Sequence, residues 1–272
     1  SVIIVEKTAM AGGNSVRSTG GMNAAATPEQ ATLSFTEGPG VEKTLEAAKS
    51  YPALAELAAA VRTQYDDYVA GGSTGYFDSV ELFVLDTLIG GKNVNNYDLV
   101  YTLAANSAAG VEWLHTIGAD LVSIASFGGA SVKRIHRPLN EEGKVVSVGA
   151  YLIPTMEKAC ADRGIEILFE SPATEILMKD GSAAGVSAGA YTVNAKAVIL
   201  ATGGFGANLD MVVSYQPALA GFVTTNAPGI TGDGIVMAEA VGAATVDMEQ
   251  IQIHPTVEQN TSALITEGLR GD

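Results

Sequence analysis

Cysteine is nearly absent from the sequence, which contains only Cys160. One cysteine rules out an internal disulfide and a cysteine-based metal site. Cys160 lies in a predicted helix, where packing is its expected role. No apolar run approaches the roughly 18 residues of a membrane span, and no secretory leader pattern is visible at the N-terminus. With 47% hydrophobic residues, the composition is typical of a soluble globular chain.

Positive charge is also scarce, because 15 lysines and arginines face 30 acidic residues and give a formal net charge of -15. Such acidity argues against nucleic acid or an anionic membrane as a partner. An anionic ligand would need positive charge concentrated locally.

Alternating apolar runs and helical periodicity predict an α/β fold, with helices packed on a parallel sheet and a small antiparallel meander. The first run is continuously apolar, which is typical of a strand covered on both faces. The expected strands cover residues 1–7, 165–169, 175–178, 184–190, 192–193 and 197–201. The expected helices cover residues 44–69, 98–117, 151–163 and 235–241. Residues 126–149 look irregular and polar.

Glu6 ends the first predicted strand. An acid at the carboxyl end of a buried parallel strand is where a dinucleotide-binding fold holds the ribose hydroxyls. The glycine-rich turn that precedes this acid in such folds is not present in the chain. A surface acid at a strand end is therefore an equal alternative.

The 31 glycines are clustered rather than spread evenly. Glycine groups occur at residues 12–13, 20–21, 203–204 and 232–234, the last at the start of a predicted helix. Backbone N–H groups in such loops can bind phosphate or ring oxygens of a flat ligand. Each group alone could be an ordinary turn, but their joint occurrence in this order favours a cofactor site.

The order of these stretches resembles the FAD-dependent fumarate reductase and succinate dehydrogenase flavoprotein family, most of all its soluble fumarate reductases and urocanate reductases. The resemblance covers nearly the whole chain. It is carried by VEK at 5–7, GGNS at 12–15, TGGMNAA at 19–25, RIHRP at 134–138, ATGGF at 201–205, TGDG at 231–234, IHPT at 253–256 and TEGLRG at 266–271. It implies a Rossmann-like FAD-binding domain over residues 1–248, without its first strand and phosphate loop. Residues 249–272 would be the truncated start of a substrate-capping domain.

By this resemblance FAD is the cofactor. Glu6 would hold the adenosine ribose, Ala173 would contact the adenine side through its backbone, and Asp233 would support the flavin site. The full set implied to bind FAD is Glu6, Lys7, Gly12, Gly13, Asn14, Ser15, Thr19, Gly20, Gly21, Met22, Ala173, Ala201, Thr202, Gly203, Gly204, Asn226, Thr231, Gly232 and Asp233.

The resemblance also implies a small unsaturated carboxylic acid as substrate, with fumarate reduced to succinate by hydride transfer from N5 of FAD. His254 and Thr266 would hold a substrate carboxylate, while Glu267 and Arg270 would relay a proton to a catalytic acid beyond residue 272. The spacing of Glu267 and Arg270 leaves an alternative to the proton relay. Residues three apart share a helix face, so the two could form a surface ion pair.

Asn14 stands where membrane-bound members carry the histidine that binds FAD covalently, so the resemblance implies non-covalent FAD. The sequence does not identify the electron donor, which could be a haem or FMN domain outside this chain. Both a cytoplasmic and an exported location stay open. Three alternatives to a fumarate reductase stay open: a urocanate reductase, another flavoprotein of this family, or a catalytically inactive fragment. Lacking the phosphate loop, the chain alone is expected to be inactive and to hold FAD weakly.

Arg134, His136 and Arg137 form a basic cluster with two interpretations. One is a solvated loop in which Arg137 pairs with a nearby acid. The other is a contact to flavin or to an anionic ligand. His115, beside Trp113 on a predicted helix, is expected to be a packed structural histidine.

Overall fold

The computed structural model describes residues 1–72 and 75–254. The chain divides into two compact units. Residues 18–156 form the first unit, and residues 1–17 join residues 157 onward in the second. Thr266, Glu267 and Arg270 lie outside the described residues.

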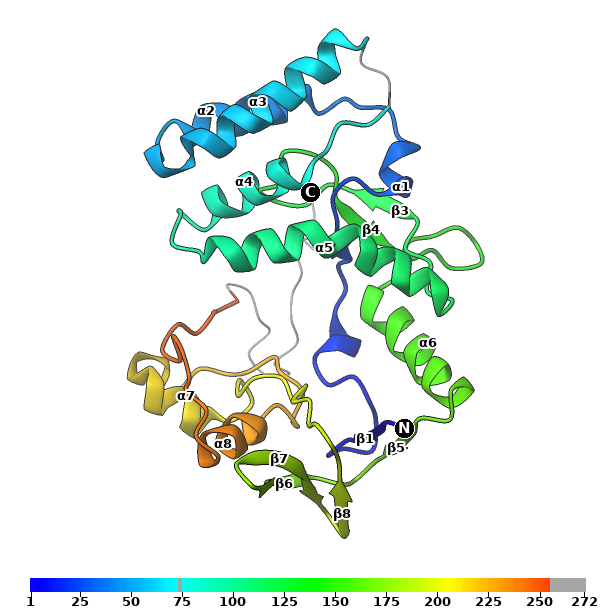
Figure 1. Cartoon of the computed structure of the whole chain (residues 1–272), viewed down its shortest axis with the longest axis vertical. Coiled ribbons are helices and arrows are strands. Elements are labelled where there is room, and N and C mark those ends of the chain that lie inside the picture. The colour runs from blue at the N-terminus through cyan, green and yellow to red at the C-terminus, as the bar shows by residue number, and fades with distance from the viewer. Residues whose placement is uncertain (73–74, 255–272) are drawn as a thin grey trace. The chain divides into compact units, whose positions relative to one another are not determined.

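The first unit is mainly helical (Figure 1). Its helices are α1 (Pro28–Ala31), α2 (Gly38–Ala48), α3 (Ala55–Ala70), α4 (Val80–Gly90), α5 (Tyr97–Thr116) and the start of α6 (Val148–Asp162), with a short 3-10 turn η2 (Pro52–Leu54). α4 packs against α2, α3 and α5. Leu82, Val84 and Leu85 are fully buried and point to different sides of α4, which makes it the central helix of this core. None of the described helices is long and apolar enough to cross a membrane.

Two helix predictions differ from the structure. The single helix expected over residues 44–69 is two helices, because Pro52 starts a separate 3-10 turn between α2 and α3. α4 was not predicted. Its residues are apolar on all sides, and a helix buried all round shows no amphipathic period.

A three-stranded antiparallel sheet completes the first unit, in the order β2 (Met22–Asn23), β4 (Ile135–Arg137), β3 (Ser123–Ala125). β4 lies inside the stretch 126–149 that looked irregular and polar. That interpretation was wrong for this segment, because Ile135 and His136 are buried.

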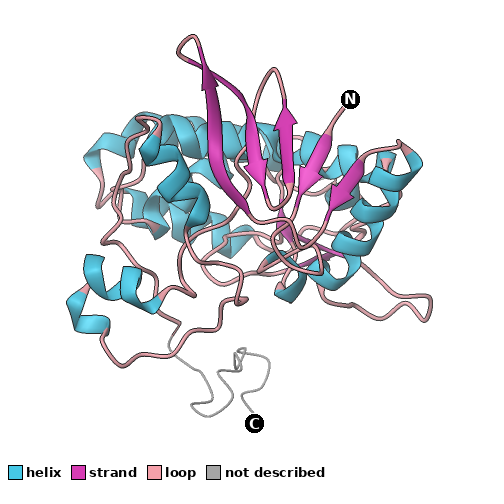
Figure 2. Cartoon of the chain, turned by 90° about the horizontal axis from the view of Figure 1, so that it is seen from below, coloured by secondary structure: helices cyan, strands magenta, loops and turns pink. Residues whose placement is uncertain are grey.

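The second unit contains β1 (Ile3–Val5), which pairs in parallel with β5 (Glu166–Leu168). β6 (Ala173–Lys179), β7 (Ser182–Ala188) and β8 (Tyr191–Asn194) form an antiparallel meander, drawn with the other strands in magenta in Figure 2. The remaining elements are η1 (Ser15–Arg17), α7 (Leu209–Tyr215), η3 (Pro217–Leu219) and α8 (Asp233–Ala240). The mixed α/β class and the meander are therefore confirmed.

The buried strand predicted over residues 197–201 is wrong. These residues pair with no strand of the described part, and Ile199 is 90% exposed. The first strand is also not covered on both faces, since Ile3 is 46% exposed and β5 is its one described partner. An apolar run predicts extended backbone, but a strand also needs a hydrogen-bonded neighbour.

Candidate functional site

Glu6 follows β1 and is held in place from its own loop. Its backbone N–H donates to the carbonyl oxygen of Leu168 at 2.9 Å, which continues the β1–β5 pairing. One carboxylate oxygen of Glu6 accepts from both the backbone N–H and the hydroxyl of Thr8, at 2.7 and 2.8 Å. The carboxylate is thus fixed at the carboxyl end of a parallel strand, the position suited to a ribose diol.

Lys7 connects the end of β1 to the start of α8. Its ammonium donates to Asp233 at 2.7 Å and to the hydroxyl of Thr231 at 2.5 Å. The Thr231 hydroxyl in turn donates to the other oxygen of Asp233 at 2.6 Å. Burial opposes ionisation of this carboxyl, but the hydrogen bonds from Lys7 and Thr231 outweigh it and lower the pKa of Asp233. Asp233 is therefore a fixed carboxylate at a helix N-terminus.

The first and third glycine loops meet on one side chain. A Cβ on Gly13 would lie 3.2 Å from Cδ1 of Ile230, and a Cβ on Gly203 would lie 3.3 Å from the same atom. The N–H of Gly232 donates to the carbonyl oxygen of Gly204 at 3.1 Å. Loops predicted separately from sequence are therefore packed together around Ile230, whereas the space beside Gly204 is open.

Asn14 joins the first loop to residues 226–227. Its side-chain N–H donates to the amide oxygen of Asn226 at 2.6 Å, and its amide oxygen accepts from the N–H of Ala227 at 2.8 Å. Asn226 also donates to the hydroxyl of Thr224. Asn14 and Asn226 thus connect two predicted cofactor loops directly.

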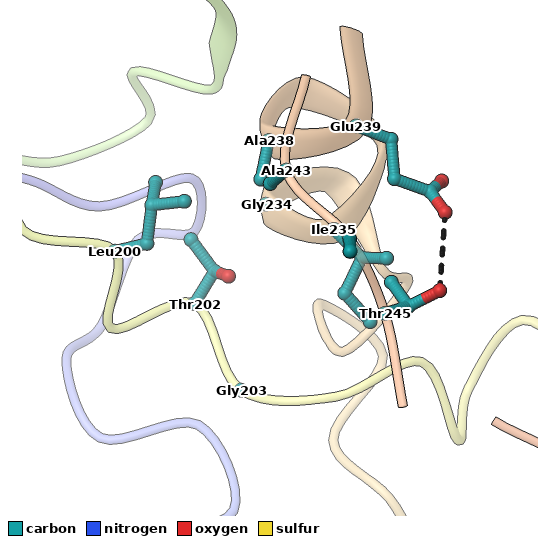
Figure 3. Close-up of a pocket in the computed structure, with 10 residues that line it drawn as sticks. Leu200, Thr202, Gly203, Gly234, Ile235, Ala238, Glu239, Ala243 and Thr245 are labelled. Atoms are coloured by element: carbon teal, nitrogen blue, oxygen red, sulfur yellow. Dashed lines mark hydrogen bonds between the residues drawn. The ribbon is translucent and has the colours of Figure 1, made fainter. Parts of the chain in front are cut away.

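A shallow pocket lies between the segment after residue 199 and α8 (Figure 3). Figure 3 shows Leu200 and Thr202 on one side, facing Gly234, Ile235 and Ala238 of α8. The backbone of Gly234 is so close to Thr202 that a side chain at this position would overlap the hydroxyl. This close approach requires glycine at residue 234.

The N-terminus of α8 has no side-chain cap. Its N-cap residue is Gly232, which is left-handed at φ 84° and offers no side-chain acceptor. Asp233 in the first turn accepts a hydrogen bond from its own backbone N–H, so the chain itself supplies the negative charge that the helix dipole favours at this end.

The second glycine loop belongs to the other unit and is built on β2. Met22 pairs with His136 of β4 and packs against the small core of Leu114, Leu121 and Val148. A Cβ on Gly21 would overlap the carbonyl oxygen of His136 and lie 2.8 Å from Cγ of Arg137. Glycine is therefore required for this loop to lie against β4.

Arg134 is a structural residue, so the solvated-loop interpretation was wrong for it. It is 1% exposed and pairs with two carboxylates, those of Asp78 at 2.8 Å and Asp86 at 2.5 Å. Burial opposes the charge, but these two partners raise the pKa of Arg134. The guanidinium also lies over the ring of Phe83, 4.9 Å from its centroid.

His136 is fully buried, so it too differs from a solvated loop residue. Its Nδ1 lies 2.7 Å from the carbonyl oxygen of Arg134, and its Nε2 lies 2.7 Å from the hydroxyl of Thr27. Burial lowers the pKa of His136, which favours the neutral form of the ring. A neutral ring donates from Nδ1 to the carbonyl and accepts from the Thr27 hydroxyl at Nε2.

The solvated-loop interpretation gives Arg137 a nearby acid as its partner, and the described residues do not provide that acid. Its Nη2 donates to the carbonyl oxygen of Thr19 at 3.1 Å, and no carboxylate in the described part of the chain forms an ion pair with it. Its Nε is buried without a hydrogen-bond partner among the described residues, as is Oδ1 of Asn23.

The remaining predicted residues are less informative. His115 lies between two carboxylates, with Nδ1 2.7 Å from Asp120 and Nε2 3.0 Å from Glu29. His254 is exposed and is the last described residue. Ala173 begins β6, and its register partner is Ala188. The described residues contain no cluster of three or more potential metal ligands.

Residues 67–272 match the sequence profile of a family described as FAD binding domain. The chain belongs to this FAD-binding family. Its residues fit the cofactor, since the fixed Glu6 carboxylate and the open space at Gly204 suit a dinucleotide. The cofactor of this chain, as of its family, is therefore FAD.

Three comparisons extend over almost the entire chain. It is 40% identical to NADH:fumarate oxidoreductase of Klebsiella pneumoniae (strain 342), covering 100% of this chain and 25% of that protein. It is 35% identical to fumarate reductase (cytochrome) of Shewanella frigidimarina, and the match covers 100% of this chain and 41% of that protein. The open conformation of a flavocytochrome c3 fumarate reductase matches with a TM-score of 0.76 and 34% identity, over 98% of this chain and 41% of the other. The chain thus spans well under half the length of the relatives it matches.

Proposed function

We propose that this chain is the flavin-binding part of a reductase that saturates the activated C=C bond of an unsaturated carboxylic acid, converting fumarate to succinate. The observation that carries the proposal is the identity of 35–40% along the whole chain to two proteins named for fumarate reduction. Residues 1–248 form the FAD-binding part in this proposal, and residues 249–272 begin a segment that caps the substrate.

When bound, FAD supplies the hydride that one alkene carbon accepts. Glu6 would hold the ribose, and Thr202, Gly203 and Gly204 would lie near the pyrophosphate. His254 donates a hydrogen bond to a substrate carboxylate, which stabilises the negative charge that develops during reduction. Thr266 donates to the same carboxylate, and Glu267 and Arg270 move a proton toward an acid outside this chain.

Steady-state kinetics of the full-length, FAD-loaded protein test this proposal. Oxidation of reduced viologen is measured with fumarate and, separately, with urocanate. Turnover with fumarate supports the proposal; turnover with urocanate alone assigns a different acid, and turnover with neither contradicts it. His254→Ala is expected to raise KM for fumarate at least tenfold, about 1.4 kcal/mol. His115→Asn is the matched control, because the partners of that ring are Asp120 and Glu29.

We also propose that FAD is bound non-covalently. The side chain at residue 14 is an amide that hydrogen-bonds to Asn226 and Ala227 and is not a nucleophile. Acid precipitation of the holoprotein is expected to leave the flavin in the supernatant. Flavin that stays with the precipitated polypeptide would contradict non-covalent binding.

A further inference from the structure

Helix α1 is contacted at its N-terminal end by two histidine rings from different parts of the first unit. Nε2 of His136, on β4, lies 2.7 Å from the hydroxyl of Thr27, the N-cap residue of α1. Nε2 of His115, in the last turn of α5, lies 3.0 Å from a carboxylate oxygen of Glu29, in the first turn of α1. The two rings thus connect α1 to β4 and to α5 through contacts that span 109 and 86 positions of the sequence.

The contacts of His115 require a protonated ring. Nδ1 lies 2.7 Å from Asp120 and Nε2 lies 3.0 Å from Glu29, so each nitrogen faces a carboxylate, which accepts hydrogen bonds and donates none. A neutral imidazole donates from one nitrogen, whereas an imidazolium donates from both. The hydrogen bond to Asp120 raises the pKa of His115, burial opposes this rise, and Glu29 adds to it. The last turn of a helix also favours a cation.

The Glu29 carboxylate depends on this ring. Its Oε1 accepts from His115, and its Oε2 is buried without a hydrogen-bond partner among the residues that the structure describes. When His115 loses its proton, the ring keeps one donor for two carboxylates. The bond to Glu29 is then lost, or it is kept with a neutral donor and is weaker. In both cases α1 loses part of its attachment to α5.

The contacts of His136 require the opposite state, a neutral ring. Nδ1 lies 2.7 Å from the carbonyl oxygen of Arg134, so this nitrogen carries the proton. The Thr27 hydroxyl accepts from the N–H of Gln30 and has its own proton to donate, for which Nε2 of His136 is the acceptor. The hydrogen-bond geometry therefore gives the two rings opposite charge states.

Acid disturbs the contact between His136 and Thr27. Burial lowers the pKa of His136 and outweighs the carboxylates of Glu29, on α1, and Asp78, before α4, which favour the charged ring. A proton on Nε2 turns this acceptor into a donor, so the Thr27 hydroxyl must give up its own hydrogen bond in a buried contact. Acidification therefore weakens the attachment of α1 to β4.

We propose that His115 and His136 form a latch that fixes α1 most tightly within a window of intermediate pH. Below the window His136 becomes charged, and above it His115 becomes neutral. The window includes pH 6.5, the ordinary pKa of histidine, because the two rings are shifted in opposite directions. Gln30 also donates to the carbonyl oxygen of Lys133, a contact without a titratable group, so α1 loosens outside the window and does not detach. The latch lies within the first unit and is independent of the substrate.

Hydrogen–deuterium exchange of the full-length, FAD-loaded protein tests the latch. Peptides over residues 24–33 report on α1, and peptides within α3 are the internal reference, because the ion pairs described for α3 contain no histidine. After correction for the intrinsic pH dependence of exchange, the ratio of α1 exchange to α3 exchange should be lowest near pH 6.5. It should rise roughly fivefold to tenfold toward about pH 5 and about pH 9. A ratio that stays constant over this range contradicts the latch.

Two variants separate the ends of the window. His115→Gln is expected to abolish the rise in α1 exchange at alkaline pH and to keep the rise in acid. His136→Asn, which keeps a donor for the carbonyl oxygen of Arg134, should abolish the rise in acid and keep the alkaline one. Loss of both rises in either variant would contradict separate roles for the two rings.

The charge states of the rings are measured in the unchanged protein as well, because His136 is fully buried and its variant could fail to fold. NMR of protein with isotope-labelled histidine reads the protonation state of each ring, and the His115→Gln spectrum assigns the His115 signal. At roughly pH 6.5, His115 should be an imidazolium and His136 a neutral ring with its proton on Nδ1. Two rings in the same charge state at this pH would overturn the inference.

Discussion

The ammonium of Lys7 lies 2.7 Å from a carboxylate oxygen of Asp233, although 226 positions separate the two residues in the sequence. This pair fixes the end of β1 to the first turn of α8. Both ends of the pair are predicted cofactor residues. Because the two side chains are in contact, Lys7 positions the carboxylate of Asp233, in addition to any contact that Lys7 itself makes with the cofactor.

Removal of the Lys7 charge is expected to weaken this connection. Lys7→Met should lower the free energy of unfolding by about 1 kcal/mol, the upper range for a partly exposed ion pair. Chemical denaturation measures the change. In a double-mutant cycle with Asp233→Asn, the coupling energy should be about 0.5–1 kcal/mol. Simple additivity of the two substitutions would contradict a direct interaction.

The pH dependence of this pair follows from the lowered pKa of Asp233. A carboxyl with a lower pKa in the folded state binds fewer protons when folded, so its stabilising effect is complete above the unfolded pKa, about 4. The effect is lost as pH falls through the folded pKa. The stability difference between the unchanged protein and Asp233→Asn should therefore be present at pH 7 and disappear in strong acid. A difference that grows on acidification would contradict the ion pair.

His115 is expected to show the opposite pH dependence. The hydrogen bond to Asp120, opposed by burial and aided by Glu29, raises the pKa of His115 above its ordinary 6.5. The stabilisation is complete below the unfolded pKa and is lost as pH rises through the folded pKa. Thermal melts of His115→Asn and the unchanged protein should differ more at roughly pH 5.5 than at roughly pH 9. Asp120→Asn should reduce the same pH-dependent difference.

Much of the site could be predicted from sequence because its parts are local. Glu6 ends a strand, and Gly232 starts α8, as the residue patterns indicated. The long-range contacts could not be predicted. Nothing in the pattern around Ile230 indicates that Gly13 and Gly203 pack against it, because no periodicity relates loops about 200 positions apart.

The errors in the predicted fold also arise from contacts between residues that are far apart in the sequence. Residues 197–201 have the composition of a buried strand, but composition does not supply a partner strand. Arg134 looked like a loop cation because charged residues are rarely fully buried. Its burial depends on Asp78 and Asp86, which lie 56 and 48 positions away. Such a cluster becomes visible only when the helices are packed.

Arg134 is expected to be essential for folding of the helical unit. Arg134→Met removes one partner and leaves two buried carboxylates, Asp78 and Asp86, without a counter-charge. Breaking a buried pair in this way costs about 3–5 kcal/mol. Chemical denaturation should show this loss, whereas Arg62→Met, which disrupts surface pairs, should cost about 1 kcal/mol or less. Equal losses for both variants would contradict a structural role for the buried cluster.

Gly21 is expected to be irreplaceable for a steric reason. A methyl group at residue 21 would overlap the carbonyl oxygen of His136, so Gly21→Ala must separate β2 from β4. We expect a stability loss of about 2 kcal/mol or more, together with weaker FAD binding, because the displaced loop carries Gly20, Gly21 and Met22, which are predicted to bind FAD. Melting temperature and flavin titration measure the two effects.

Gly110 provides the matched control for this substitution. It lies within α5, and a Cβ there would meet no atom within 4 Å. Gly110→Ala should therefore stabilise the protein by about 0.5–1 kcal/mol through helix propensity alone, with FAD affinity unchanged. The two substitutions add the same methyl group, so opposite signs of the stability change isolate the contact between Gly21 and β4. A Gly21→Ala protein that is as stable and binds FAD as tightly as Gly110→Ala would show that β2 does not need to lie this close to His136.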